Sequence, residues 1–263
     1  MSYIVNNKAA WEEAFDHRHP NWGSDNDLKL KNEQLPFFNQ NLRNELEQME
    51  FENKVVAHFC CNNGRELLSL MQLGAKNGVG FDIAENIIAQ AKETAEKAGI
   101  ANCTFEACNI LDIAPDYHNA FDFIFFTIGA ITWFEDLTLL FNKVSSCLKP
   151  NGVVLINDFH PLVNMLPLLG DDCFDANNLN RLTYSYFRKE PWMEDTGMGY
   201  MSVSYQSKIF TSFSHTMSSI INSLSMNGMK TIKLDEFDSD IGMSDVYDRK
   251  GYPLSFTLIA QKC

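Results

Sequence analysis

The chain has 263 residues, of which 45% are hydrophobic and 21% are charged. This balance is typical of a globular protein with a large core, and it excludes a disordered chain. The 34 acidic and 21 basic residues give a formal net charge of −13. Because an acidic surface repels phosphate backbones and anionic lipids, we expect no nucleic-acid partner and no membrane partner.

Seven cysteines are scattered along the chain without the CxxC spacing of a metal site, so we predict no metal and expect reduced thiols in a reducing compartment. The first seven residues lack a basic region and a continuous apolar core, which argues against a signal peptide. No stretch approaches the ~18 apolar residues of a membrane span. The expected location is cytoplasmic.

Residues 1–50 carry aromatic side chains among polar ones and show no strand pattern. Helices are predicted over residues 9–15 and 39–49, separated by proline and glycine breakers. We interpret residues 1–50 as an N-terminal helical flap that packs on the edge of a sheet. The alternative is that its aromatic side chains and His17 or His19 close over a substrate.

From residue 53 onward, strand and helix patterns alternate, which predicts an α/β fold with a doubly wound, mostly parallel sheet. The predicted strands are Lys54–Phe59, Gly78–Asp82, Cys103–Ala107, Asp122–Thr127 and Val153–Asp158, and the predicted helices are Arg65–Leu73, Glu85–Ala98 and Leu137–Leu148.

After Asp158 the alternation stops, and prolines, aromatics and charges follow without a clean period. We predict that residues 160–212 form a cap insertion over the carboxyl ends of the strands. A helix over Ser214–Met226 and two late strands, Met229–Phe237 and Leu254–Ala260, complete the pattern. Residues 51–263 are thus expected to form one α/β domain with an insertion.

The first strand, a turn and the first helix follow one another directly, and the second strand ends on Asp82. In an open α/β sheet, such a turn presents backbone N–H groups and a helix N-terminus to a ligand. A carboxylate at the end of the next strand is placed to accept hydrogen bonds from ribose hydroxyls. The pattern therefore predicts a nucleoside-type cofactor.

Several motifs together resemble the class I S-adenosylmethionine-dependent methyltransferases, whose Rossmann-like, seven-stranded sheet has an antiparallel last strand. The segments that carry the resemblance are Val56–Gly64, Phe81–Ile83, Cys108–Ile110, Phe121–Ile124 and Leu148–Val153. The chain is most similar to a bacterial, small-molecule-type subgroup with a His-x-x-Cys-x-x-Gly first motif. That subgroup also shares segments like Asp158–Pro161 and Tyr252–Phe256.

The first motif departs from the pattern of the wider family. His58 stands where that family has Asp, and Cys60 and Asn62 stand at its first two glycines, so that only Gly64 remains. Asn62 can still make the turn, because Asn tolerates a positive φ. Cys60 brings a Cβ close to the expected methionine moiety of the cofactor. The resemblance implies that binding is retained, and a degenerate fold that no longer binds cofactor is the alternative.

The resemblance implies a site for S-adenosylmethionine, with S-adenosylhomocysteine as product. Asp82 would accept from both ribose hydroxyls, although it could instead only cap the following helix. The implied cofactor contacts are the first motif (His58, Cys60, Asn62 and Gly64), Asp82, Ile83 on the adenine, Asn109 and the Ile110 backbone at the adenine amino group, Thr127 and Gly129 beneath the sulfonium, and Trp133 beside the cofactor.

Methyl transfer needs alignment of the acceptor with the methyl group and exclusion of water, and a base helps where the acceptor is a hydroxyl or an amine. His160, just past the fifth strand, is the first candidate, with Asp158 as an orienting partner. His215, at the start of a late helix, is the second. Both have structural alternatives, a turn at His160 and a helix cap at His215.

The sequence thus predicts S-adenosylmethionine-dependent methyl transfer to an unidentified small-molecule acceptor, by a monomer or homodimer. One alternative is a nicotinamide-dependent oxidoreductase, which the missing GxGxxG motif and the late strands disfavour. The other is a non-catalytic methyltransferase-like protein that binds a cofactor or metabolite. An aromatic-rich insertion suits a small, partly apolar substrate.

Overall fold

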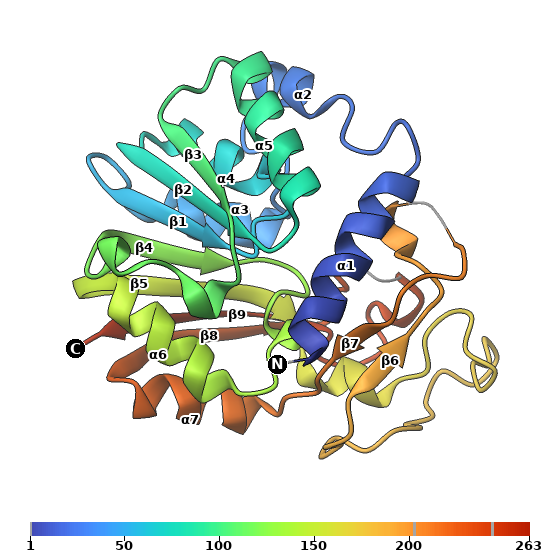
Figure 1. The fold of residues 1–263 in the computed structure, drawn as a ribbon. Coiled ribbons are helices and arrows are strands. Elements are labelled where there is room, and N and C mark those ends of the chain that lie inside the picture. The colour runs from blue at the N-terminus through green and yellow to red at the C-terminus, as the bar shows by residue number, and fades with distance from the viewer. Residues whose placement is uncertain (1, 202–203, 243–244) are drawn as a thin grey trace.

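The computed structural model describes residues 2–201, 204–242 and 245–263, and a seven-stranded sheet lies at its centre (Figure 1). The strand order is β3-β2-β1-β4-β5-β9-β8. Strands β1 to β5 are parallel, and β9 runs antiparallel to its neighbours β5 and β8. The strands are β1 (Val55–Phe59), β2 (Asn77–Asp82), β3 (Cys103–Ala107), β4 (Phe121–Phe126), β5 (Leu148–Phe159), β8 (Met229–Phe237) and β9 (Ser255–Lys262). The predicted fold class is confirmed.

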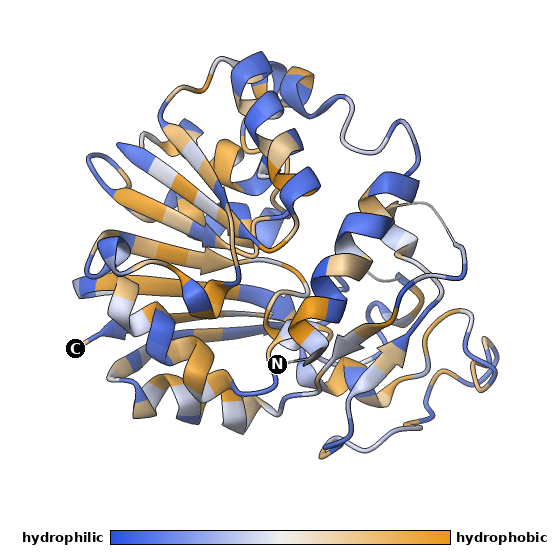
Figure 2. Cartoon of the chain, in the orientation of Figure 1, coloured by the Kyte–Doolittle hydropathy of each residue, from blue (hydrophilic) through white to orange (hydrophobic). Residues whose placement is uncertain are grey.

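Helices cover both faces of the sheet, which explains why its central strands are apolar almost throughout (Figure 2). The helices are α1 (Ser2–His17), α2 (Asn26–Asn32), α3 (Gln40–Glu47), α4 (Arg65–Leu70), α5 (Glu85–Ala98), α6 (Leu137–Cys147) and α7 (Met217–Met226). Strand β4 alternates between the faces: Ile124 and Phe126 join the core with α6 and α7, whereas Phe123 and Phe125 join that with α3, α4 and α5.

Most element boundaries lie within a few residues of the predicted ones, and β3, α5 and β8 match them fully. The first predicted helix is α only to Leu70 and continues as a 3₁₀ turn over Met71–Leu73. Strand β5 begins earlier than expected because Leu148 already pairs with Phe121, and a shift of register follows before Val153 pairs with Phe123.

The insertion, defined here as residues 160–212, contains a small antiparallel pair formed by β6 (Trp192–Glu194) and β7 (Phe210–Ser212). Three-residue strands are too short to give a periodic pattern, so the sequence did not reveal them. Among the described residues no helix is long and apolar enough to cross a membrane.

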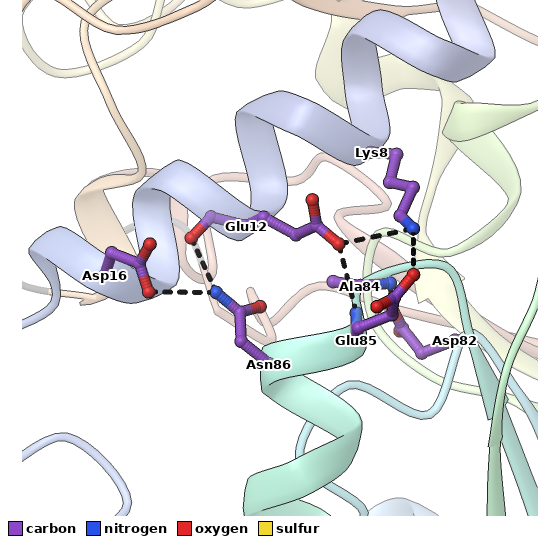
Figure 3. Close-up of polar contacts among 7 residues, drawn as sticks. All are labelled: Lys8, Glu12, Asp16, Asp82, Ala84, Glu85 and Asn86. Atoms are coloured by element: carbon purple, nitrogen blue, oxygen red, sulfur yellow. Dashed lines mark hydrogen bonds and ion pairs between the residues drawn. The ribbon is translucent and has the colours of Figure 1, made fainter.

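Helix α1 begins earlier than the predicted first helix and contacts the N-terminal end of α5 (Figure 3). The Asn86 amide donates to the Glu12 carbonyl (2.8 Å) and to Asp16 Oδ1 (3.0 Å). Lys8 pairs with Glu85 in the same contact. These bonds hold α1 beside the end of β2, where Asp82 lies.

The other side of α1 is joined to the insertion through Asn7, which is 5% exposed. Its amide donates to the Thr211 carbonyl and accepts from the Thr211 N–H, both at 2.8 Å. Figure 1 shows α1 alongside β7 as a result. A residue near the N-terminus thus completes the hydrogen bonding of a strand about two hundred positions away.

Replacing Asn7 with Ala should lower the free energy of unfolding by about 2 kcal/mol, because both Thr211 backbone groups lose their partner in a buried position. Urea denaturation measures the change. The matched control is Asn6→Ala, at an exposed position of the same helix, which should change stability by less than about 0.5 kcal/mol. Equal losses in the two variants would contradict the assigned role of Asn7.

His58 is a buried polar residue within the sheet, 1% exposed. Its ring stacks on Phe125 (centroids 4.0 Å apart, planes at 11°), and its Nε2 lies 2.9 Å from Thr127 Oγ1. Burial lowers the pKa of His58 to about 3, so the ring is neutral in the folded protein at neutral pH.

The pKa of His58 makes part of the stability pH-dependent. Below the ordinary pKa of 6.5 the His58 ring is protonated in the unfolded chain, but in the folded protein it stays neutral down to about pH 3. The free energy of unfolding therefore falls as the pH drops through this range. Between about pH 6.5 and about pH 5 the wild type should therefore lose about 2 kcal/mol more of its free energy of unfolding than the His58→Phe variant. Denaturation curves at both pH values test this. His118→Phe, at an exposed histidine, is the control, and an unchanged pH slope in His58→Phe would refute the prediction.

Candidate active site

A cavity of about 980 Å³ lies at the carboxyl ends of the parallel strands. Its floor comes from the ends of β1, β2, β4 and β5, and its cover from α1 and the insertion. The volume is at the upper end of the range for small-molecule sites, which leaves room for a cofactor and an acceptor together. All the predicted cofactor contacts except Gly64 line this cavity.

The turn after β1 adopts a left-handed backbone at two of the positions where the family has glycine. Cys60 has a φ of 57° and Asn62 a φ of 49°. The expectation that Asn62 tolerates a positive φ is confirmed, whereas the same conformation at Cys60 was not foreseen. Left-handed residues other than glycine cost roughly 1–2 kcal/mol each, so the surroundings must hold this turn in place.

Gly64 has a positive φ of 74°, and its role in the structure is packing. A Cβ at this position would lie 2.4 Å from Phe105 Cε1 and 3.0 Å from the Ala91 Cβ. Gly64 therefore lets α4 approach β3 and α5 closely, and it is not among the residues that line the cavity.

Asp82 holds the turn in place and faces the cavity. Its Oδ2 accepts from the Asn62 N–H at 2.8 Å, and its Oδ1 accepts from the Ala84 N–H at 3.1 Å. Burial raises the pKa of Asp82, and the backbone N–H groups of Ala84, Asn62 and Ile83 partly offset that rise. Asp82 thus binds the N–H of Ala84, the residue before α5, and lines the cavity; its role toward the ribose stays a prediction.

The expected adenine end of the site is formed by Ile83 after β2 and by Asn109 and Ile110 after β3. The Asn109 side-chain Oδ1 accepts from the Leu111 N–H at 3.2 Å, and its Nδ2 donates to Asp112 Oδ2 at 2.9 Å. The Asn109 side chain is thus engaged within its own turn, which leaves the backbone here to read a base.

The segment that follows β4 contains Thr127, Gly129 and Trp133, and all three line the cavity. Gly129 has a φ of 76°. Trp133 packs edge-on against Trp11 of α1, with ring centroids 5.3 Å apart. This contact brings the N-terminal helix to the expected position of the sulfonium, and the sequence had not singled out Trp11 from the other aromatics of residues 1–50.

Asp158 does not orient His160, as the sequence analysis had expected. Its Oδ1 accepts from the N–H groups of Gly129 (2.6 Å) and Phe159 (2.8 Å), and its Oδ2 from that of Ile131 (3.3 Å). Burial raises the pKa of Asp158 to about 6, although these hydrogen bonds lower it. Asp158 thus joins the end of β5 to the bend after β4.

His160 lies outside the cavity lining, and both its ring nitrogens are engaged. Nε2 is 2.8 Å from Glu236 Oε1 of β8, and Nδ1 accepts from the Leu162 N–H at 3.1 Å. His215 does line the cavity, and its Nε2 lies 2.9 Å from the Phe134 carbonyl. The structure therefore brings only His215 of the two candidate bases to the cavity.

Several insertion aromatics close the cavity, and Tyr200 reaches the first turn. The Asn62 amide donates to the Tyr200 hydroxyl at 2.7 Å, and the Tyr200 ring packs against Trp11 and Trp22. Tyr184 and Trp192 also line the cavity, whereas Tyr186, Phe187 and Tyr205 do not. Spacing in an aperiodic segment gives no signal that could have separated these two groups.

The site fits the cofactor that the sequence analysis predicted. The Asp82 carboxylate lines the cavity and is bound by the backbone N–H groups of Asn62 and Ala84, and its remaining lone pairs can accept hydrogen bonds from a ligand. Asp82 supplies a carboxylate at the expected ribose position. No group of three or more metal-ligating side chains is found in the part of the chain that the structure describes.

The chain shows sequence similarity to known methyltransferases. It is 31% identical to a tRNA U34 carboxymethyltransferase of Campylobacter hominis over 111 residues, which are 41% of this chain and 37% of that relative. The chain thus matches little more than a third of the length of this curated relative.

Solved structures share the fold. An S-adenosylmethionine-dependent methyltransferase of Mesorhizobium loti superposes with a TM-score of 0.63 at 18% identity, covering 84% of this chain and 96% of that one. The geranyl diphosphate C-methyltransferase of Streptomyces coelicolor, solved with S-adenosyl-L-homocysteine, also gives 0.63, at 12% identity, covering 100% and 98%. Likeness at these identities shows the fold alone.

A family model described as a methyltransferase domain matches residues 50–207, more than half of the chain. This match decides against the nicotinamide-dependent oxidoreductase, and it agrees with the sheet order and the cavity described above. The chain belongs to the methyltransferase domain family.

Proposed function

We propose that the enzyme transfers a methyl group from S-adenosylmethionine to a small molecule, which is held beside this cofactor beneath α1 and the insertion. The observation that carries this proposal is the cavity of about 980 Å³, which reaches from Asp82 at the cofactor end to Trp192 and Glu194 in the insertion. Helix α1 and the insertion act as its cover, and residues 51–263 contain the catalytic domain.

The cofactor lies across the ends of β1 to β4 in this proposal. Asp82 binds the ribose hydroxyls, Ile83 and Ile110 flank the adenine, and Asn109 positions the Ile110 backbone. The remaining contacts are His58, Cys60 and Asn62 at the amino-acid end and Thr127, Gly129 and Trp133 near the sulfonium. Gly64 contributes by letting α4 pack against β3 and α5.

The bound cofactor supplies a methyl group on a positively charged sulfur. The chain aligns the acceptor with that methyl group and excludes water, which the aromatic cover of Trp11, Trp133 and Tyr200 serves. Where the acceptor loses a proton, His215 is the proposed proton acceptor, since burial lowers its pKa and keeps the ring neutral. His160 is the weaker candidate, because it pairs with Glu236.

We propose that the protein works as a monomer or as a homodimer. We propose a cytoplasmic location, because all seven cysteines are unpaired and Cys263 is exposed, as suits a reducing compartment.

Replacing Asp82 with Asn should weaken binding of S-adenosylhomocysteine by about ten- to a hundredfold, since hydrogen bonds to a carboxylate exceed those to a neutral amide. Isothermal titration calorimetry measures the affinity. S-adenosylmethionine should also stabilise the wild type in a thermal-shift assay, and NAD should not.

Asp116→Asn is the matched control for this experiment, because Asp116 is exposed and does not line the cavity. The melting temperatures of both unliganded variants show whether the Asn62 turn survives. Unchanged affinity in a folded Asp82→Asn variant would remove Asp82 from the site, and absence of binding to the wild type would refute the proposed site.

The variant Tyr200→Phe tests whether the insertion holds the cofactor turn closed. It keeps the ring between Trp11 and Trp22 but loses the bond from Asn62. We expect S-adenosylhomocysteine to dissociate about fivefold faster, as for one lost hydrogen bond. Stopped-flow tryptophan fluorescence measures the rate, with Tyr205→Phe, outside the cavity lining, as the control. An unchanged rate in Tyr200→Phe would contradict this role.

A further inference from the structure

We propose that the acceptor is a phenol, which is methylated on its oxygen while the Thr127 hydroxyl donates a hydrogen bond to that oxygen. This inference rests on the proposed function and names the substrate class of the same cavity. It also gives the buried His58 a role: His58 is a positioning residue that fixes the direction of the Thr127 hydroxyl.

The His58 ring carries its single proton on one of two nitrogens, and its surroundings select the nitrogen. The ring is 1% exposed and stacks on Phe125. Nε2 lies 2.9 Å from Thr127 Oγ1, whereas Nδ1 is buried without a hydrogen-bond partner among the described residues. A proton on Nδ1 would be a buried N–H without an acceptor, which folded proteins avoid. The proton therefore lies on Nε2, which donates to Thr127 Oγ1.

The Thr127 hydroxyl is consequently a hydrogen-bond donor toward the cavity. Since its oxygen accepts from His58 Nε2, its own proton is free for another acceptor. Within the described part of the chain this hydroxyl has no second partner, and Thr127 lines the cavity two positions before Gly129. A ligand atom beside Thr127 must therefore accept a hydrogen bond, and in the proposed function this is the place of the sulfonium and its methyl group.

A fixed donor at this place selects the kind of atom that can react. The attacking atom uses one lone pair for the bond to the methyl carbon, so it needs a second lone pair to accept from Thr127. A hydroxyl oxygen has two lone pairs, an unprotonated amine has one, and sulfur is a weak acceptor. The bond from Thr127 also stabilises the negative charge that develops on oxygen as its proton leaves.

The walls beside Thr127 favour an aromatic hydroxyl over a carboxylate. Trp133 and Phe159 line the same part of the cavity, and a Cβ at Gly129 would lie 3.7 Å from Phe159 Cε2. Arg65 is the one Lys or Arg side chain among the described lining residues, and it pairs with Glu66 at 2.8 Å. A carboxylate acceptor would thus lack a free cation, whereas a neutral phenol needs none and packs its ring on the aromatic wall.

The proposed step balances without a further reactant. The phenol oxygen attacks the methyl carbon with one lone pair and forms a C–O bond, and the electron pair of the breaking C–S bond stays on sulfur. The phenol proton passes to His215, the proton acceptor proposed above, and from there to water. The products are an aryl methyl ether, S-adenosylhomocysteine and one proton.

The first test reads the His58 proton directly. Heteronuclear NMR of the histidine ring nitrogens at neutral pH should show His58 with a protonated Nε2 and an unprotonated Nδ1, and the signals are assigned by their loss in His58→Phe. A proton on Nδ1 would overturn the proposal, because the Thr127 hydroxyl would then donate to His58.

The second test titrates para-nitrophenol, with para-nitroaniline as the matched amine, into the protein saturated with S-adenosylhomocysteine. Calorimetry should show the phenol binding at least about tenfold more tightly than the amine. Thr127→Val should weaken phenol binding about tenfold, and Thr127→Ser, which keeps the hydroxyl, should stay within about twofold. The ionised fraction of bound para-nitrophenol, read from its phenolate absorbance, should fall in Thr127→Val and not in Thr127→Ser. Thr104→Val, at an exposed threonine of β3 outside the cavity lining, should change neither readout.

Three further results would overturn the proposal: no binding of para-nitrophenol, catechol or naphthol; equal binding of para-nitroaniline; or phenol binding that Thr127→Val does not alter. Weaker binding of S-adenosylhomocysteine alone in Thr127→Val would assign the hydroxyl to the cofactor and refute the phenol site. Titrating para-nitrophenol without any nucleoside separates the two proposals. Phenol binding that depends on Thr127, in a protein that fails to bind S-adenosylhomocysteine, would support the phenol site and refute the cofactor site.

Discussion

The hydrogen bond from the Asn62 N–H to Asp82 is the contact on which the site depends. Left-handed Cys60 and Asn62 cost roughly 1–2 kcal/mol each, and a bond to a carboxylate contributes about 1.5–3 kcal/mol in return. The Cys61 N–H adds a bond to the Phe81 carbonyl at 2.9 Å. The end of β2 therefore holds in place a turn that the family forms with glycines.

The sheet and its flanking helices could be predicted because each element has a local pattern. Strand β4 is apolar except for Asp122 because both its faces are covered, and α5 has a polar face and an apolar one. Asp82 was singled out by the same patterns, because it ends a predicted strand, whereas Asn109 came from the family resemblance; both line the cavity.

The cover of the site could not be predicted, since contacts between distant segments create it. Nothing near Asn7 in the sequence indicates Thr211, and nothing near Asn62 indicates Tyr200. The prediction that Asp158 orients the His160 ring was wrong for the same reason. A carboxylate at a strand end has several backbone N–H groups within reach, and Asp158 binds those of Gly129 and Ile131.

The floor and the cover of the cavity have different roles in the proposed reaction. Its floor comes from the ends of the parallel strands, where we propose that the cofactor binds, so the floor says little of the acceptor. Its cover comes from α1 and the insertion, which are joined to each other at Asn7 and to the floor at Tyr200. We propose that the acceptor lies beneath that cover, so the insertion can select the acceptor while Asp82 holds the turn after β1.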